Sequence, residues 1–175
     1  MFLFGHLGVT LALFFILGYL VPGFRNHINY WYVALGAVLP DIIDKLVGRV
    51  LFPYSLASGH LIAHTLAFVL ILAVAGLIRF RDHGDARILL ISGASLLHLL
   101  EDRLWTQPAL LLWPLFGWGL PHGTPPDNWI DYFTIMFRRS IHPEFSFDFV
   151  AEAVGFAVIA ICVLACLISR RKARK

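Results

Sequence analysis

The chain has 175 residues, of which 59% are hydrophobic and only 14% are charged, and its formal net charge at pH 7 is +3. A soluble domain of this length carries more charge and shorter apolar runs, so the composition excludes a soluble globular protein. With a mean hydropathy of +0.77, the chain is predicted to be all-α, a polytopic integral-membrane helical bundle. No polar linker divides it, so we expect one domain over residues 1–175.

Five apolar runs are predicted to be membrane-spanning helices, at residues 7–22, 28–43, 61–78, 88–104 and 149–169. The first run has no basic leader and no cleavage motif, which favours a retained helix over a removed signal peptide. Pro40 is expected to end the second helix just before Asp41. Residues 105–147 are rich in Trp, Phe and Pro, and they predict an interfacial or re-entrant region.

Lys and Arg predict the orientation of these spans. The last residues, 170–175, read RRKARK and are typical of a cytoplasmic tail beside a membrane, so the expected partner is the lipid bilayer and no nucleic acid is expected. With five spans, nine basic residues share the side of this tail and five lie on the other side. The positive-inside rule then places the N-terminus outside and the C-terminus in the cytoplasm.

On this topology, four helices bring histidines and aspartates to the same outer end. Pairs of these residues lie three or four positions apart, which puts the two members of a pair on one helix face. Ionisable groups within a membrane cost several kcal/mol each and mark functional sites. The residues are His6, Asp41, Asp44, His60, His64, His98 and Asp102.

Imidazole and carboxylate groups together are ligands for divalent transition metals. The set exceeds the needs of one four-coordinate ion, so we expect two or three ions, zinc first, with iron or manganese as alternatives. Such a site activates a water molecule while it holds a phosphoryl or carbonyl oxygen. Read separately, the Asp41 and Asp44 pair could instead cap a helix or pair with Lys45 and Arg49.

Several neighbouring residues have two interpretations. Glu101 could be a general base, a partner of a ligand, or a charge pair with Arg103. Arg49 and Arg103 could hold a substrate phosphate, as guanidinium groups do, or lie at the membrane edge as snorkelling side chains. Among the loop histidines, only His122 is kept as an additional candidate ligand; the others, at positions 27, 83 and 142, are expected at the solvated surface.

The motifs GHLGVT, GAVLPDIIDK, IAHTL, LLHLLEDRLW and LLWPLFG occur in this order over residues 1 to about 120. Together they resemble the YdjM-like membrane-bound metal-dependent hydrolases, a family similar to the zinc-dependent phospholipase C and nuclease group. The resemblance implies a multi-metal site that cleaves phosphate esters. Its motif positions are occupied here by His6, Asp41, Asp44, His64, His98 and Asp102. Many relatives carry the pattern H-R-G-x-T-H-S where this chain reads HLIAHT, so among the candidate ligands His60 matches the family least well.

The sequence therefore predicts an integral protein of the inner membrane, a metal-dependent hydrolase whose site lies at the extracytoplasmic face. Its expected substrate is a phosphate ester in a lipid or lipid-linked molecule, with the aromatic segment 105–120 holding the apolar chains. A metal-ion or proton transporter is the first alternative, although the cluster lies at one face and no inverted repeat is visible. A non-catalytic membrane protein with a structural metal site is the second, although such sites close with about four ligands.

Overall fold

The computed structural model describes residues 3–52, 54–56, 58–122, 134–135, 138 and 147–172, and the regular structure in these residues is helical. Five long helices occupy the five apolar runs, which confirms the all-α prediction. They are α1 (Leu3–Leu20), α3 (Tyr30–Lys45), α4 (Leu66–His83), α5 (Arg87–Glu101) and α8 (Phe147–Lys172). Short elements connect them: α2 (Pro22–Arg25), the π-helix η1 (Leu46–Leu51), the 3₁₀-helix η2 (Leu104–Thr106) and α6 (Pro108–Leu111).

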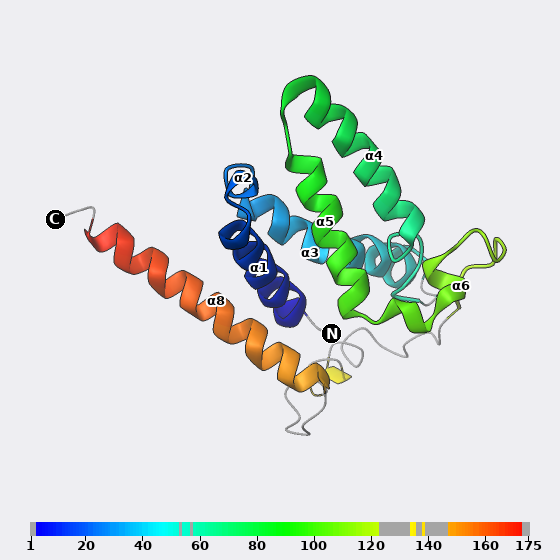
Figure 1. The fold of residues 1–175 in the computed structure, drawn as a ribbon. Helices are drawn as coiled ribbons and strands as arrows, with labels where there is room; N and C mark the ends of the chain where they lie inside the picture. Colours follow the sequence, from blue (N-terminus) through cyan, green and yellow to red (C-terminus); the bar gives the residue numbers. More distant parts are fainter. Residues whose placement is uncertain are drawn as a thin grey trace.

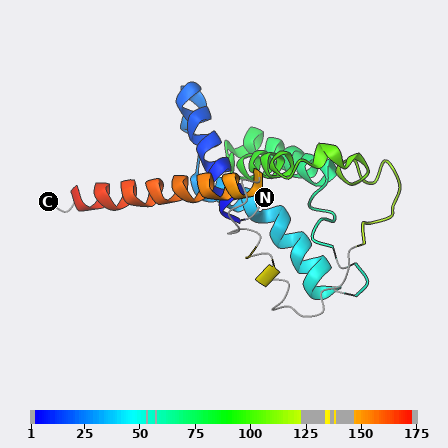
Figure 2. The ribbon, with the colours of Figure 1, turned by 90° about the horizontal axis from the view of Figure 1, so that it is seen from below.

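The helices form a bundle in which α3 and α5 cross at the centre (Figure 1). Helix α4 packs against α5 as an antiparallel hairpin, α1 packs against α3, and α8 packs against α1. The core between α1, α3 and α5 contains Phe14, Val33, Leu90 and Ala94. Gly36 permits the close crossing of α3 and α5, since a side chain there would collide with the backbone of Ile91. In two views at right angles, the C-terminal half of α8 extends away from the other helices (Figures 1 and 2).

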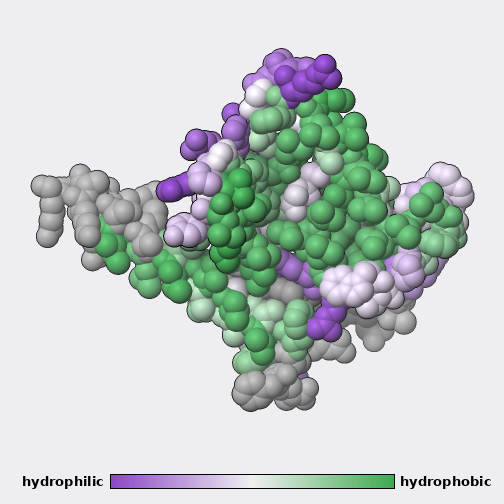
Figure 3. All heavy atoms as spheres, in the orientation of Figure 1, coloured by the Kyte–Doolittle hydropathy of each residue, from purple (hydrophilic) through white to green (hydrophobic). Residues whose placement is uncertain are grey.

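The surface of the bundle is mainly apolar. Figure 3 shows hydrophobic side chains over α1, α4 and α5, and hydrophilic side chains gathered at the turn between α4 and α5. That turn begins at Gly84, which closes α4 with a φ of 67°, and Asp85 there accepts hydrogen bonds from Arg79 and Arg87. His98 lies in the last turn of α5 and His64 in the loop just before α4, so both lie at the opposite end of this helix pair from the hydrophilic turn.

By length and composition, one helix of the described residues is long and apolar enough to cross a membrane, namely Leu3–Leu20. The five-span topology therefore stays a prediction. In the segment expected to be interfacial or re-entrant, residues 105–122 form the rest of η2, helix α6 and turns. Most of residues 123–147, including His142, and the last three residues of the basic tail lie outside the described residues.

Pro40 does not end the second helix, contrary to the prediction, because α3 continues through it to Lys45. Proline has no N–H with which to bond the carbonyl four residues earlier, here that of Gly36. The hydroxyl of Ser95 on α5 donates to this carbonyl instead, at 3.1 Å. A neighbouring helix therefore satisfies the group that proline leaves without its usual partner, and the helix can persist.

The third apolar run also differs from the prediction, since α4 begins at Leu66 rather than at residue 61. Thr65 is the N-cap residue, and its hydroxyl accepts a hydrogen bond from the Phe68 N–H. His60 and His64 consequently lie on the loop before α4, and the prediction that they share a helix face is wrong.

Candidate metal centre

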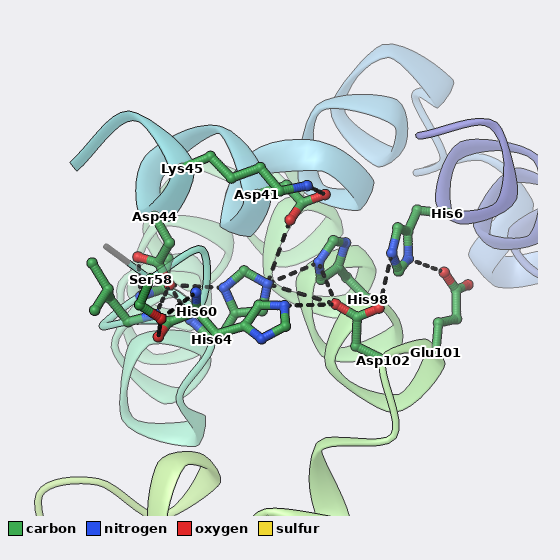
Figure 4. Close-up of polar contacts among 12 residues, drawn as sticks. His6, Asp41, Asp44, Lys45, Ser58, His60, His64, His98, Glu101 and Asp102 are labelled. Carbon is green, nitrogen blue, oxygen red and sulfur yellow. Dashed lines mark hydrogen bonds and ion pairs between the residues drawn. The ribbon is translucent and has the colours of Figure 1, made fainter. Parts of the chain in front are cut away.

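Three buried histidines from three separate segments meet at one end of the bundle (Figure 4). His6 comes from the first turns of α1, His64 from the loop before α4, and His98 from the last turn of α5. Each is at most 1% exposed. The rings of His6 and His98 are stacked, with centroids 3.9 Å apart. The sequence therefore folds so that imidazoles far apart in the chain share one small polar interior.

The Nδ1 atom of each of these histidines has a fixed hydrogen-bond acceptor at 2.7 Å. His6 bonds to Glu101 Oε2, His64 to Asp44 Oδ2, and His98 to the backbone oxygen of Ala37. Carbonyl and ionised carboxylate oxygens accept and do not donate, so each Nδ1 carries the proton. In a neutral ring, Nε2 then presents a lone pair, which is the arrangement found in metal-ligating histidines.

The Nε2 atoms of His64 and His98 face each other, and the Nε2 atoms of all three histidines lie near the Asp102 carboxylate. His64 Nε2 lies 3.2 Å from His98 Nε2. Asp102 Oδ2 lies 3.5 Å from His98 Nε2 and 3.7 Å from His64 Nε2, while its Oδ1 lies 3.1 Å from His6 Nε2. Asp102 follows the last residue of α5, so it extends from the end of that helix into the space between the imidazoles.

These separations fit a divalent metal ion. Zinc binds nitrogen and oxygen ligands at about 2.0–2.1 Å, so two ligands of a tetrahedral ion are about 3.4 Å apart. The buried Nε2 of His6 has no hydrogen bond of acceptable geometry, although Asp102 is close to it. A buried polar atom of this kind calls for a partner. Three overlapping trios can each hold an ion: His6, His98 and Asp102; Asp41, His64 and His98; and His60, His64 and Asp102.

Asp44 has a different place from the one predicted for it. Its Oδ2 accepts hydrogen bonds from the N–H groups of Leu61 and His64 and from His64 Nδ1, and its Oδ1 accepts one from the N–H of Ala63. Asp44 is 1% exposed. This carboxylate therefore fixes the loop before α4 and orients His64, instead of pointing at the space shared by the Nε2 atoms.

Glu101 holds His6 rather than standing free as a base. Its Oε2 accepts from His6 Nδ1, and its Oε1 accepts from the hydroxyl of Thr10 at 2.9 Å. Sequence reasoning missed Thr10, although its position one helical turn after His6 is a signal that could have found it. The arrangement corresponds to the second of the roles weighed for Glu101, that of a partner to a ligand.

Asp41 lies at the edge of the cluster and pairs with Lys45, one of the two basic partners that the sequence suggested for it. Its Oδ1 is 3.7 Å from His64 Nε2, and its Oδ2 pairs with Lys45 Nζ at 2.7 Å. Lys45 is four residues later on α3, the spacing of a helical ion pair. The pair places an ammonium group beside the candidate metal centre, whereas the sequence suggested Arg49 and Arg103 as the groups that hold a substrate phosphate.

His60 lies at the open side of the cluster. Its Nε2 is 3.7 Å from Asp102 Oδ2, and its side chain is 41% exposed, unlike those of the three buried histidines. Burial of part of its ring against the cluster lowers the pKa of His60 to about 4, so its imidazole is neutral at pH 7. A neutral exposed ring can serve as a ligand that is exchanged for water or substrate.

The remaining candidates lie farther out. Arg103 is exposed and places its guanidinium 3.9 Å from the centre of the Phe147 ring. Arg49 lies on the π-helix η1 and is half-buried. His122 is exposed and belongs to none of the three trios. The structure therefore does not bring His122 to the cluster, and it shows Arg103 stacked on an aromatic ring.

A comparison with protein families assigns nearly the whole chain to one family. The family model of the YdjM inner membrane protein matches residues 1–173. No curated protein and no solved structure matches the chain. The match covers all the helices that contribute to the candidate metal centre, and the chain belongs to the YdjM inner membrane protein family.

Proposed function

We propose that this protein is an integral-membrane, metal-dependent hydrolase that acts on a phosphate ester in a lipid or lipid-linked substrate. The observation that carries the proposal is the common orientation of three buried histidines. Each is fixed through Nδ1, and each directs Nε2 at Asp102 or at another imidazole. Such pre-orientation is characteristic of metal ligands.

The proposed ligands are His6, His64, His98, Asp102 and Asp41, with His60 as the exposed ligand. The trios overlap, since His98, His64 and Asp102 each belong to two of them. Overlapping trios favour two neighbouring ions that share ligands, a pattern typical of phosphate ester hydrolases. When bound, zinc or a related ion would supply Lewis-acid activation of water and of the phosphoryl oxygen.

The protein's own groups would organise the remainder of the site. Glu101 and Asp44 hold His6 and His64 in the tautomer that leaves Nε2 available. Lys45 provides a positive charge near Asp41, suited to an anionic substrate oxygen. Arg49 and Arg103 remain the further candidates for the phosphate that the sequence indicated.

A lipid substrate is supported by the surroundings of the centre. The segment that follows Asp102 exposes large aromatic side chains, and the family is one of inner membrane proteins. Amphipathic aromatics favour the headgroup depth of a bilayer. The exposed aromatics are Trp105, Phe116 and Trp118. We place the centre at the extracytoplasmic face, as the distribution of basic residues predicts.

Metal analysis followed by a hydrolysis screen tests this function. The purified full-length protein in lipid nanodiscs would be loaded with zinc, manganese or iron, and the bound metal counted by mass spectrometry. The zinc-loaded protein would then be offered phosphatidic acid, phosphatidylglycerol and an isoprenyl phosphate, with release of phosphate or headgroup measured.

We expect about two zinc ions per chain and turnover of at least one lipid phosphate, both reduced in Asp102→Ala. His122→Ala is the matched control, because His122 lies outside the cluster, and it should bind and hydrolyse as the wild type does. Bound metal without turnover of any phosphate ester would contradict the hydrolase. Metal passage across sealed vesicles in that case would support a transporter instead.

A further inference from the structure

We propose that the C-terminal helix α8 completes the metal centre. Glu152 and Phe147 act as positioning residues for one half of this centre, the trio of His6, His98 and Asp102. The proposal rests on the proposed function, since it concerns the same centre. Figure 1 shows the first turns of α8 beside the start of α1, below the end of α5, while the rest of α8 extends away. The first turns of α8 contact the chain on both sides of this half of the centre.

The first contact is a buried carboxylate that caps α1. Glu152 is 8% exposed, and its Oε1 accepts a hydrogen bond from the Gly5 N–H at 2.8 Å. The first N–H groups of a helix have no partner within that helix, and a negative charge there is stabilised by the helix dipole. Gly5 directly precedes His6, so Glu152 fixes the backbone from which this imidazole extends.

The second contact involves the residue after Asp102. The Arg103 guanidinium lies over the ring of Phe147, the first residue of α8, with 3.9 Å between its central carbon and the ring centre. Arg103 has a φ of 56°, in the left-handed region that residues other than glycine rarely adopt. The stacked side chain therefore holds an unfavourable turn that directly follows Asp102.

Close packing makes α8 and α1 one unit. Gly8 and Gly155 face each other at the crossing, and a side chain at either position would collide with the backbone of the other helix. The rings of Phe4 and Phe156 meet edge to face beside it, with centroids 5.8 Å apart. Small residues permit such close approach between membrane helices. The position of α8 is thus transmitted directly to the start of α1.

These contacts predict a selective effect on one half of the centre. His6 Nε2 and Asp102 Oδ1 are 3.1 Å apart. Helix α8 contacts Gly5, which precedes His6, and Arg103, which follows Asp102. Asp41 and His64 are instead held by Lys45 and Asp44, on α3. Loss of the α8 contacts should therefore weaken binding by His6, His98 and Asp102 and spare the other half.

The test is zinc titration of the full-length protein in nanodiscs, with the number of bound ions and their dissociation constants as readouts. Glu152→Ala should lower zinc affinity at one of two positions about 10- to 100-fold, the range known for partners of metal ligands. Glu152→Gln keeps an oxygen that accepts from Gly5 and should restore much of that affinity. Phe147→Leu should weaken the same position.

Val154→Ala is the matched control, a truncation of an exposed residue on the same helix. In a background with Asp41→Asn, which weakens the other position, Glu152→Ala should remove most of the remaining zinc binding. If Glu152→Ala does not fold, Phe147→Leu decides the matter. Unchanged affinities in folded Glu152→Ala or Phe147→Leu would overturn the role of α8. A wild-type protein that binds no zinc would instead overturn the proposed function.

Discussion

The Nε2 atoms of His64 and His98 face each other across 3.2 Å in the buried interior of the bundle. Both rings already donate through Nδ1, to Asp44 and to the Ala37 carbonyl. In neutral rings the two lone pairs would repel at this distance, so the contact calls for a cation between them, either a proton or a metal ion. The contact supports the proposal that both histidines are metal ligands.

Zinc should stabilise the wild-type protein against unfolding, and His98→Gln should abolish most of that effect. A ligand that binds the folded state alone at about 100 times its dissociation constant adds roughly 2.7 kcal/mol. Thermal unfolding with zinc and with a chelator measures the difference. His27→Gln is the control, because His27 is exposed near α2. An equal zinc-dependent shift in His98→Gln would contradict the assignment of His98 as a ligand.

Glu101→Gln separates positioning from base catalysis. The Glu101 carboxylate accepts from His6 and Thr10, and a partner of a metal ligand typically changes metal affinity about 10- to 100-fold when it is replaced. We therefore expect weaker zinc binding in Glu101→Gln and a smaller loss in Thr10→Val. Full zinc occupancy with loss of turnover alone would show instead that Glu101 acts as a general base.

Asp44→Asn should destabilise the fold as well as the centre. The buried carboxylate accepts four hydrogen bonds, three of them from backbone N–H groups. An amide NH₂ would face some of those donors, and a hydrogen bond to a charged group is worth about 1.5–3 kcal/mol. Chemical denaturation should show a loss of roughly 2–4 kcal/mol. Asp82→Asn, at an exposed position on α4, is the control, and equal stability of the two variants would contradict this role.

The sequence predicts the helices of this protein well, because long apolar runs bounded by Pro, Gly and charged residues have few alternatives. It also selects most members of the cluster, since acids and imidazoles in such runs are costly unless used. It could not separate Asp41 from Asp44, because helical spacing puts both on one face. Only the path of the loop before α4, which brings three N–H groups to Asp44, gives the two aspartates different partners.

The sequence was also uninformative about contacts between distant segments. Glu152 stands in an apolar helix far along the chain, and no spacing relates it to Gly5. The same holds for Ser95 and the Gly36 carbonyl, which allow α3 to continue past Pro40. These pairs depend on which helices cross and at which residue. The packing of glycines and small side chains determines those crossings. The hydrophobic pattern along a single helix does not show which other helix it will cross.

Pro40→Ala tests whether the proline in α3 prepares the site for His98. An alanine N–H could bond the Gly36 carbonyl, which now accepts from Ser95, and the tightened turn would draw the next carbonyl, of Ala37, away from His98. Zinc affinity should therefore fall, while thermal stability without metal should be kept or increased, because proline inside a helix is unfavourable by about 3 kcal/mol. Ser95→Ala separates the loss of the hydroxyl from the change in helix shape. Unaltered zinc affinity in Pro40→Ala would show that the proline does not matter to the centre.

Single cysteines can establish on which side of the membrane the centre lies. Tyr54, in the segment before α4, and His83, the last residue of α4, are both exposed, and the whole of α4 separates them in the chain. In a chain with Cys162→Ser and Cys166→Ser, Tyr54→Cys should react with an impermeant maleimide in intact cells. His83→Cys should react only after the membrane is opened, because Arg79, Arg81 and Arg87 favour the cytoplasmic side.

The reverse pattern would place the centre at the cytoplasmic face and remove the extracytoplasmic substrate from the proposal, but it would leave the metal ligands unchanged. Labelling of both positions in intact cells would show that α4 does not cross the bilayer. That result would contradict the five-span topology itself, since α4 and α5 would then form a hairpin on one side of the membrane. The labelling therefore separates the orientation of the protein from the number of its spans.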